Sequence, residues 1–270
     1  MLRKAATSTQ ITHLQRLWLY LLCGLVVVFL VAPTLLVVPM SFSSSRFLQF
    51  PPPDWSLRWY RAYFNSIEWR DATFTSLQVA IWTMLVSTIT GTMAAYGLHY
   101  CKLSLRRSVQ IALALPMMIP VILIAVGVFM LFAPLGLNNT IPGLVLAHST
   151  LAIPLVMISV SAGLRSFDAN QEMVARSLGA SRIRAFLTVT LPQIANSVVS
   201  GALLAFVTSF DEVVISLFVA GGDKATLTRR MFLALRDEID PTIAAISTLL
   251  ILFSIVLVGA SQFLRPRPKT

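Results

Sequence analysis

The 270-residue sequence has little charge and almost no cysteine. Only 12% of its residues are Asp, Glu, Lys or Arg, whereas soluble globular proteins carry about 25%. The two cysteines, Cys23 and Cys101, have no paired spacing, which argues against a disulfide framework. Three histidines, His13, His99 and His148, are too scattered to predict a metal site. These shortages argue against a soluble domain and against a metal- or disulfide-stapled scaffold.

The sequence also lacks the common motifs of enzymes and of nucleotide-binding loops. GxSxG is absent, and no pairing of a nucleophile with a base is visible. GxxxxGK[ST] is absent too, because the only similar run, at residues 221–224, has the wrong spacing. We therefore expect a chain that is not an enzyme and that binds no cofactor of its own.

Long apolar runs are what the sequence has instead. Hydrophobic residues make up 56% of the chain and the mean hydropathy is +0.79. Several uncharged runs reach the ~20 residues with which a helix crosses a bilayer, and they are solidly apolar rather than alternating as in a β-barrel. One run is split by the turn-rich stretch at 135–143. The sequence predicts an all-α integral membrane protein with six transmembrane helices, at 18–40, 73–97, 109–132, 144–164, 193–217 and 241–264.

The positive charges indicate how these helices are oriented. With six spans, one side holds thirteen Lys and Arg residues against two acids, and the other holds eight against seven. Cytoplasmic loops carry the excess of Lys and Arg, so both termini are predicted to be cytoplasmic. The net charge of +10 is then a topology signal and does not predict nucleic-acid binding. The cytoplasmic set comprises Arg3, Lys4, Arg16, Lys102, Arg106, Arg107, Arg165, Arg176, Arg182, Arg184, Arg265, Arg267 and Lys269.

One membrane domain, residues 1–270, is the expected organisation, since no internal repeat is visible. Pro116 and Pro120 each remove a backbone hydrogen bond from the third span. Such breaks persist where neighbouring helices or water satisfy the freed carbonyls. We therefore expect a kinked, inward-facing third helix.

A polar segment, QEMVARSLGASRIRAFLTVTLPQ, separates the fourth and fifth spans. Met173, Val174 and Leu178 share one side of a short helix, with Glu172 and Arg176 turned elsewhere. Gly179 is expected to end this helix in the left-handed conformation, and Ser181 to cap a second one. Pro192 marks the bend into the fifth span. Periodicity alone leaves open a loop that lies flat among lipid headgroups.

ARSLGA, whose Gly179 is followed after nine residues by Val189-Thr190-Leu191-Pro192, resembles the EAA loop of permease subunits of binding-protein-dependent ABC importers. In that family the motif reads Glu-Ala-Ala, three residues, Gly, nine residues, Ile, any residue, Leu-Pro. Here Met173 stands at the Glu position, with Glu172 one place earlier, and Val174 and Val189 replace Ala and Ile. The resemblance implies a type I ABC importer permease fold in a bacterial inner (cytoplasmic) membrane.

The resemblance also implies that a loop at about 165–192 docks as a coupling helix on a separate ATPase. The coupling residues would be Glu172, Val174, Ala175, Arg176, Leu178, Gly179, Ala180, Ser181 and Pro192. The implied partners are two ATPase subunits, which hold ATP and Mg, a second permease subunit of a different chain, an external substrate-binding protein and membrane lipid.

Two acids, Asp211 and Glu212, lie in apolar surroundings in the predicted fifth span. Intramembrane carboxylates cost about 2.5 to 3.5 kcal/mol, so they usually face a cavity or a partner. On a helix Thr208, Glu212 and Ser216 line up, with Ser209 and Asp211 beside them. Such a stripe suits a pathway for a cationic solute. The alternative is a structural pair at the span's outer end, bonded to Arg229 or Arg230 or solvated among headgroups.

The last third of the chain points to a solute class. SFDEVVISLFVAG, TLTRRMF and IDPTIAAISTLL look like the final third of spermidine/putrescine-type permeases. That resemblance implies inward polyamine transport by alternating access, and related permeases carry other amines, opines or aminophosphonates. An ion-coupled secondary transporter or channel is a rival class that would need no ATPase, and a membrane enzyme or assembly scaffold is another.

Overall fold

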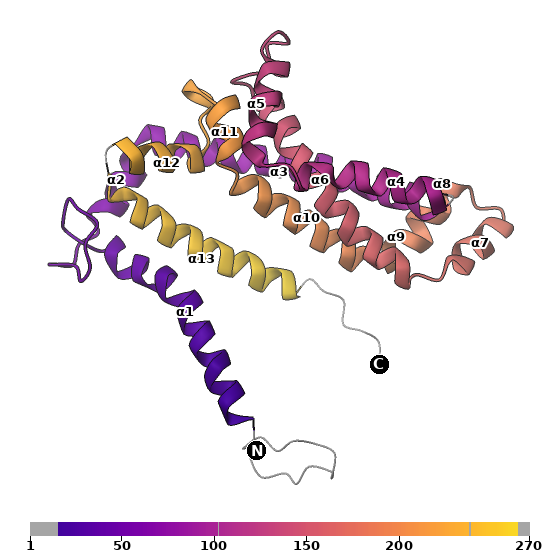
Figure 1. Ribbon diagram of the computed structural model, residues 1–270, viewed down its shortest axis with the longest axis horizontal. Helices are drawn as coiled ribbons and strands as arrows, with labels where there is room; N and C mark the ends of the chain where they lie inside the picture. The colour runs from indigo at the N-terminus through magenta and orange to yellow at the C-terminus, as the bar shows by residue number, and fades with distance from the viewer. Residues whose placement is uncertain (1–15, 102, 238, 264–270) are drawn as a thin grey trace. The chain divides into compact units, whose positions relative to one another are not determined.

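A computed structural model describes residues 16–101, 103–237 and 239–263. Within these ranges every regular element is helical apart from one isolated bridge between Ser43 and Trp55 (Figure 1). The all-α prediction is therefore confirmed for the described residues. Part of the basis for the predicted orientation lies outside them, namely Arg3, Lys4, Lys102, Arg265, Arg267 and Lys269, as does His13.

Backbone contacts divide the described chain into two units. The first holds residues 16–65 and 239–258, and the second holds 66–101, 103–237 and 259–263. Unit 1 contains α1 (Leu17–Ser41), α2 (Arg58–Asn65) and most of α13 (Thr242–Phe263). The apolar window of α1 is 0% buried.

Unit 2 contains the remaining helices. Their bounds are α3 (Ile67–His99), α4 (Leu103–Ala114), α5 (Val121–Phe132), α6 (Ile141–Ser166), α7 (Ala169–Ser177), α8 (Arg182–Ala185), α9 (Leu191–Gln193), α10 (Ala195–Phe210), α11 (Val214–Val219) and α12 (Leu227–Asp237). Short 3-10 turns lie at Leu115–Met117 and Gly222–Lys224, and a π-helix lies at Phe186–Thr190.

Three helices, α1, α3 and α6, are each long and apolar enough to cross a membrane. Two bent pairs raise the number to five if each pair is one span. Within the described residues, the apolar part of α13 covers only Thr242–Val256, which is shorter than a usual membrane span. The count of six spans therefore stays a prediction.

The third predicted span is broken rather than kinked. Its two parts, Arg106–Met117 and Val121–Phe132, meet at 93°. Pro116 lies in the 3-10 turn and Pro120 caps α5. Neither proline donates a backbone hydrogen bond, so two prolines four residues apart leave the helix without two of its bonds. The expectation of one kinked helix was wrong in degree, because the chain turns through a right angle.

The fifth predicted span, 193–217, is not one helix. α10 ends at Phe210 and α11 begins at Val214. Before α10, the segment Arg182–Gln193 meets Ala195–Phe210 at 80°. The alignment of Thr208, Glu212 and Ser216 on a single helix was therefore wrong, because their spacing has this meaning only where the helix is continuous.

α3, α6 and α10 pack together and form the core of unit 2. Val156 of α6 is fully buried at their meeting point. A Cβ at Gly91 of α3 would lie 2.8 Å from the Val156 Cβ, and one at Gly201 of α10 would lie 3.2 Å from its Cα. Small residues allow membrane helices to approach this closely. Two glycines thus set the spacing of the core.

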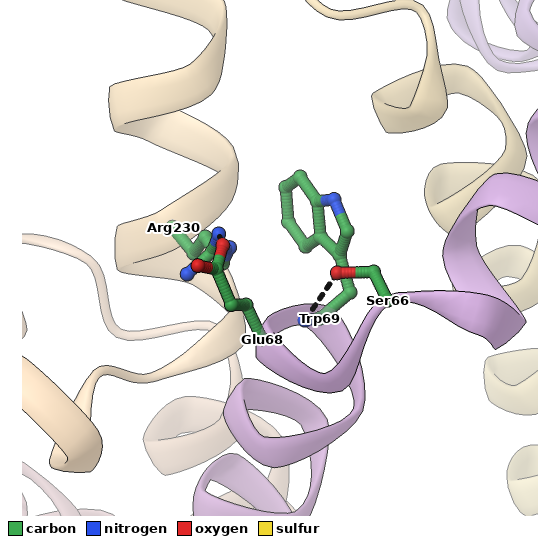
Figure 2. Close-up of polar contacts among 4 residues, drawn as sticks. All are labelled: Ser66, Glu68, Trp69 and Arg230. Atoms are coloured by element: carbon green, nitrogen blue, oxygen red, sulfur yellow. Dashed lines mark hydrogen bonds and ion pairs between the residues drawn. The ribbon is translucent and has the colours of Figure 1, made fainter.

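The N-terminal end of α3 is joined to α12 (Figure 2). Ser66 caps α3 by accepting a hydrogen bond from the Trp69 backbone at 3.3 Å. Arg230 of α12 pairs with Glu68, and its guanidinium carbon lies 5.1 Å from the Trp69 ring centroid. Glu68 is exposed, so this ion pair contributes at most about 1 kcal/mol.

Candidate functional site

The loop at 165–192 folds as two short helices joined by a tight turn, as the sequence predicts. Asp168 caps α7 by accepting from the Asn170 backbone at 3.0 Å. α7 ends before Leu178, and Gly179 follows with φ +94°, the left-handed conformation that favours glycine. Ser181 then caps α8 by accepting from the Arg184 backbone at 3.3 Å. The predicted roles of Gly179 and Ser181 in this turn are confirmed.

Large apolar side chains of this loop face outward. The exposed fraction is 84% for Leu178 and 74% for Ile183, and Met173, Val174 and Leu187 are each more than half exposed. Arg176, Ser181 and Pro192 are exposed as well, and Ala175 and Ala180 are half-buried. A run of exposed apolar side chains on a polar loop is typical of a surface that contacts a partner.

Glu172 differs from the rest of the loop because it is only 2% exposed. Its carboxylate accepts three hydroxyl bonds: Tyr96 donates to Oε1 at 2.6 Å, and Tyr100 and Thr190 donate to Oε2 at 2.9 Å and 2.6 Å. Arg182 lies over both tyrosines, with its guanidinium carbon 5.5 Å and 5.3 Å from the two ring centroids. We call these five residues the Glu172 cluster.

The bonds of this cluster keep a buried carboxylate charged. Burial alone would raise the pKa of Glu172, but the three hydroxyl bonds and the charge of Arg182 lower it below its usual value. Burying an unpaired charge costs several kcal/mol. A hydrogen bond to a charged group returns about 1.5 to 3 kcal/mol, so three of them offset that cost.

The cluster ties α7 to two other segments. Tyr96 is in α3 and Tyr100 caps its end, while Thr190 is the last residue of the π-helix that leads through α9 to α10. A π turn holds more residues than an α turn, so it rotates the side chains that follow by about 100° for each extra residue.

Glu172 was expected to act at the loop surface, and the structure instead turns it inward.

The predicted pathway residues lie around the break between α10 and α11. Glu212 is half-buried, and its Oε1 accepts from the Ile215 backbone at 2.9 Å, which caps α11. Its carbonyl accepts from Ser216 and Thr228, each at 3.0 Å. Asp211 is exposed at the end of α10. The two acids thus differ, because Glu212 holds the backbone and Asp211 faces outward.

A histidine that no sequence motif singled out joins this region. His148 of α6 is buried, and its Nδ1 lies 2.9 Å from the Ser209 Oγ and its Nε2 3.2 Å from the Ser216 Oγ. The Ser216 hydroxyl donates to the Glu212 carbonyl, so it accepts from Nε2 and the Ser209 hydroxyl donates to Nδ1. His148 therefore brings Ser209 and Ser216 together, whereas Thr208 lies half-buried on α10.

Most of the chain matches a known family of transport proteins. Residues 87–270 match the family described as "Binding-protein-dependent transport system inner membrane component". The match covers more than half of the chain and includes both the 165–192 loop and the α10–α11 break. The chain belongs to this family. It is therefore an inner-membrane permease and a non-catalytic component of a transport system.

Curated relatives of the permease cover most of its length. It is 32% identical over 237 residues to the spermidine/putrescine transport system permease protein PotC of Haemophilus influenzae. This match covers 87% of this chain and 91% of the relative. It is 30% identical to PotC of Escherichia coli K12, over 90% of this chain and 91% of the relative. The putrescine transport system permease protein PotI of the same organism is 32% identical, over 86% and 84%.

Solved structures show the same fold. The permease resembles a chain of a bacterial ABC transporter involved in alginate import, with a TM-score of 0.72 and 15% identity over 97% of this chain and 100% of the other. A second alginate transporter structure, in complex with its ligand-bound periplasmic protein, gives a TM-score of 0.69 at 15% identity over 91% and 92%. The ABC importer permease fold expected from the motif is thus supported by backbone geometry.

Proposed function

We propose that the permease is one of two membrane subunits of an ATP-driven importer that moves a small cationic solute, a polyamine such as spermidine or putrescine, inward by alternating access. The polyamine assignment is supported by the named functions of PotC and PotI, which match the permease at about 30% identity over most of its length.

The exposed apolar face of the 165–192 loop carries the proposal. The face is formed by side chains of three short helical segments and of the turn after the first one, namely Met173, Val174, Leu178, Ile183 and Leu187. These segments are too short to be stable alone, since isolated helices need about 12 to 15 residues. The Glu172 cluster holds these helices in place, so their apolar face is a fixed surface. Such a surface fits the cleft of an ATPase subunit that closes on ATP binding.

A membrane surface is the rival occupant of this face. Lipid contact would bury the same apolar side chains and place arginines near phosphates. The ATPase is favoured because the family is binding-protein-dependent and the chain has no nucleotide-binding motif of its own. We therefore place ATP and Mg on two separate ATPase subunits.

Further partners are proposed on similar grounds. An external binding protein would deliver the solute, as the family description implies. The exposed apolar surface of α1 suits lipid together with a second membrane subunit, a different chain. Thr208, Asp211 and Glu212 would line part of the solute pathway, with the buried Ser209 and Ser216 behind them. Asp211 is the member with a carboxylate exposed for contact with an amine.

The test is reconstitution of the permease with its three kinds of partner in lipid vesicles. Spermidine and putrescine, each with the loaded binding protein, should stimulate ATP hydrolysis and enter the vesicles. An opine and an aminophosphonate serve as matched solutes of other chemistry. Stimulation by one of these instead would replace the polyamine, and uptake driven by an ion gradient without the ATPase would refute the importer.

A further inference from the structure

The Glu172 cluster joins three segments that are distant in sequence. Glu172 is separated from Tyr96 by 76 residues, from Tyr100 by 72 and from Thr190 by 18. One carboxylate therefore connects α7 with the end of α3 and with the π-helix before α10. Helices α3 and α10 are two of the three that form the core of unit 2.

Aromatic contacts add to the hydrogen bonds of the cluster. The Tyr96 and Tyr100 rings are 5.1 Å apart, and Phe186 of the π-helix lies 4.6 Å from Tyr96. Arg182 of α8 packs over the same two tyrosines. Every short element of the 165–192 loop between α6 and α9 thus contributes a side chain to one cluster.

We propose that the Glu172 cluster is the joint that passes movement of the docked loop to α3 and α10 together, with Tyr96, Tyr100 and Thr190 as its positioning residues. This inference rests on the proposed function, because it needs an ATPase that moves the loop. In this role Glu172 contacts no partner itself. Its contribution is to fix the direction in which the exposed apolar face is displaced.

A purely structural role makes a different prediction. If the cluster only stabilised the fold, a weakened cluster would lower assembly, ATP hydrolysis and uptake in parallel. If it transmits movement, a weakened cluster would leave the complex assembled and hydrolysing ATP while fewer solute molecules enter per ATP. The ratio of uptake to hydrolysis therefore separates the two roles.

Thr190 allows a matched experiment. Thr190→Val removes the hydroxyl that donates to Glu172, whereas Thr188→Val removes a hydroxyl two residues away that bonds to the Arg184 carbonyl at 2.7 Å. Thr190→Ser keeps the hydroxyl and serves as the rescue variant. Each is tested in the complete complex in vesicles, with spermidine as the solute, for ATPase co-purification, ATP hydrolysis and uptake.

We expect Thr190→Val to keep the ATPase bound and to lower uptake per ATP about tenfold, the factor that one bond to a charged group can supply. Thr188→Val and Thr190→Ser should match the wild type. Tyr100→Phe removes a second hydroxyl of the cluster and should repeat the effect. Equal ratios of uptake to ATP hydrolysis in Thr190→Val and Thr188→Val would refute the proposal. Loss of assembly in both Thr190→Val and Tyr100→Phe would refute it as well. A wild type that binds no ATPase would instead refute the proposed function beneath it.

Discussion

The close contact of α3 with α6 predicts that Gly91 tolerates no side chain. In Gly91→Ala the new Cβ would lie 2.8 Å from the Val156 Cβ, 2.9 Å from its Cγ1 and 3.1 Å from the Ile153 carbonyl oxygen. Carbon atoms pack best at about 3.5 to 4.0 Å, so the two helices must separate. Val156 is fully buried and also touches α10, which leaves it little room to move.

The size of the effect follows from two opposing terms. Overpacking of a core costs about 1 to 3 kcal/mol, whereas exchanging Gly for Ala inside a helix gains about 1 kcal/mol. Gly127→Ala in α5 is the matched control, because no atom lies within 4 Å of its added Cβ. Both variants share the helical gain, so their difference in unfolding free energy is the packing cost, about 1 to 3 kcal/mol.

The assay is thermal unfolding of the purified permease in one detergent. One kcal/mol shifts the midpoint by roughly 2 to 4 °C for domains of this size, so Gly91→Ala should unfold below Gly127→Ala by roughly 2 to 12 °C. Unfolding midpoints that coincide, or a higher midpoint for Gly91→Ala, would show that Gly91 does not set the close approach of α3 to α6.

Four further predictions concern the loop, the core and the pathway. Gly179→Val, at φ +94°, should weaken ATPase co-purification because a β-branched residue costs about 1 to 3 kcal/mol in that conformation. The control Gly222→Val, at φ +54°, should leave co-purification intact. Equal loss in both variants would contradict docking at the loop. Thr83→Val should leave the unfolding midpoint unchanged or raise it, since the buried Thr83 hydroxyl has no partner among the described residues, and a fall would show a missing bond. Asp211→Asn should reduce uptake of a cationic amine without loss of assembly, and unchanged uptake would make that acid structural. Glu212→Gln changes the hydrogen bond to the first turn of α11, so it should lower the unfolding midpoint as well as uptake. The pKa of Glu172 is lowered in the folded protein, so its charge stabilises the fold at pH values above the ordinary Glu pKa of 4.5. This contribution is lost as the pH falls through the lower pKa of the folded state. The unfolding midpoints of the wild type and of Glu172→Gln should therefore converge only below pH 4.5.

Local signals in the sequence predicted local structure well. The long helices α1, α3 and α6 appear where uncharged apolar runs occur, because a helix satisfies its own backbone in lipid. Gly179 and Ser181 were predicted as turn and cap from residue type alone, and the structure gives the expected φ and hydrogen bond. These features depend on a few neighbouring residues, so one sequence is enough to find them.

Contacts between distant segments were beyond such signals. Glu172 is buried by residues 72 and 76 positions away, and nothing in the spacing around it indicates those tyrosines. His148 bonds to serines 61 and 68 positions away, and no local pattern around it indicates those serines. The breaks at Pro116–Pro120 and at Asp211–Val213 were underestimated because hydropathy measures apolar content and not helix continuity.

Docking of the ATPase on the exposed face of the 165–192 loop can be tested by cross-linking. Leu178 is the most exposed large apolar residue of this face at 84%, and Leu135, 62% exposed in the connection between α5 and α6, is the control. Each would be replaced by cysteine in a background with Cys23→Ser and Cys101→Ser, and a bifunctional reagent would be added to the complete complex in vesicles. We predict that Leu178→Cys cross-links to the ATPase subunit and that Leu135→Cys does not. Labelling of Leu178→Cys by lipid-soluble reagents alone, with no ATPase cross-link, would show that lipid and not the ATPase covers this face.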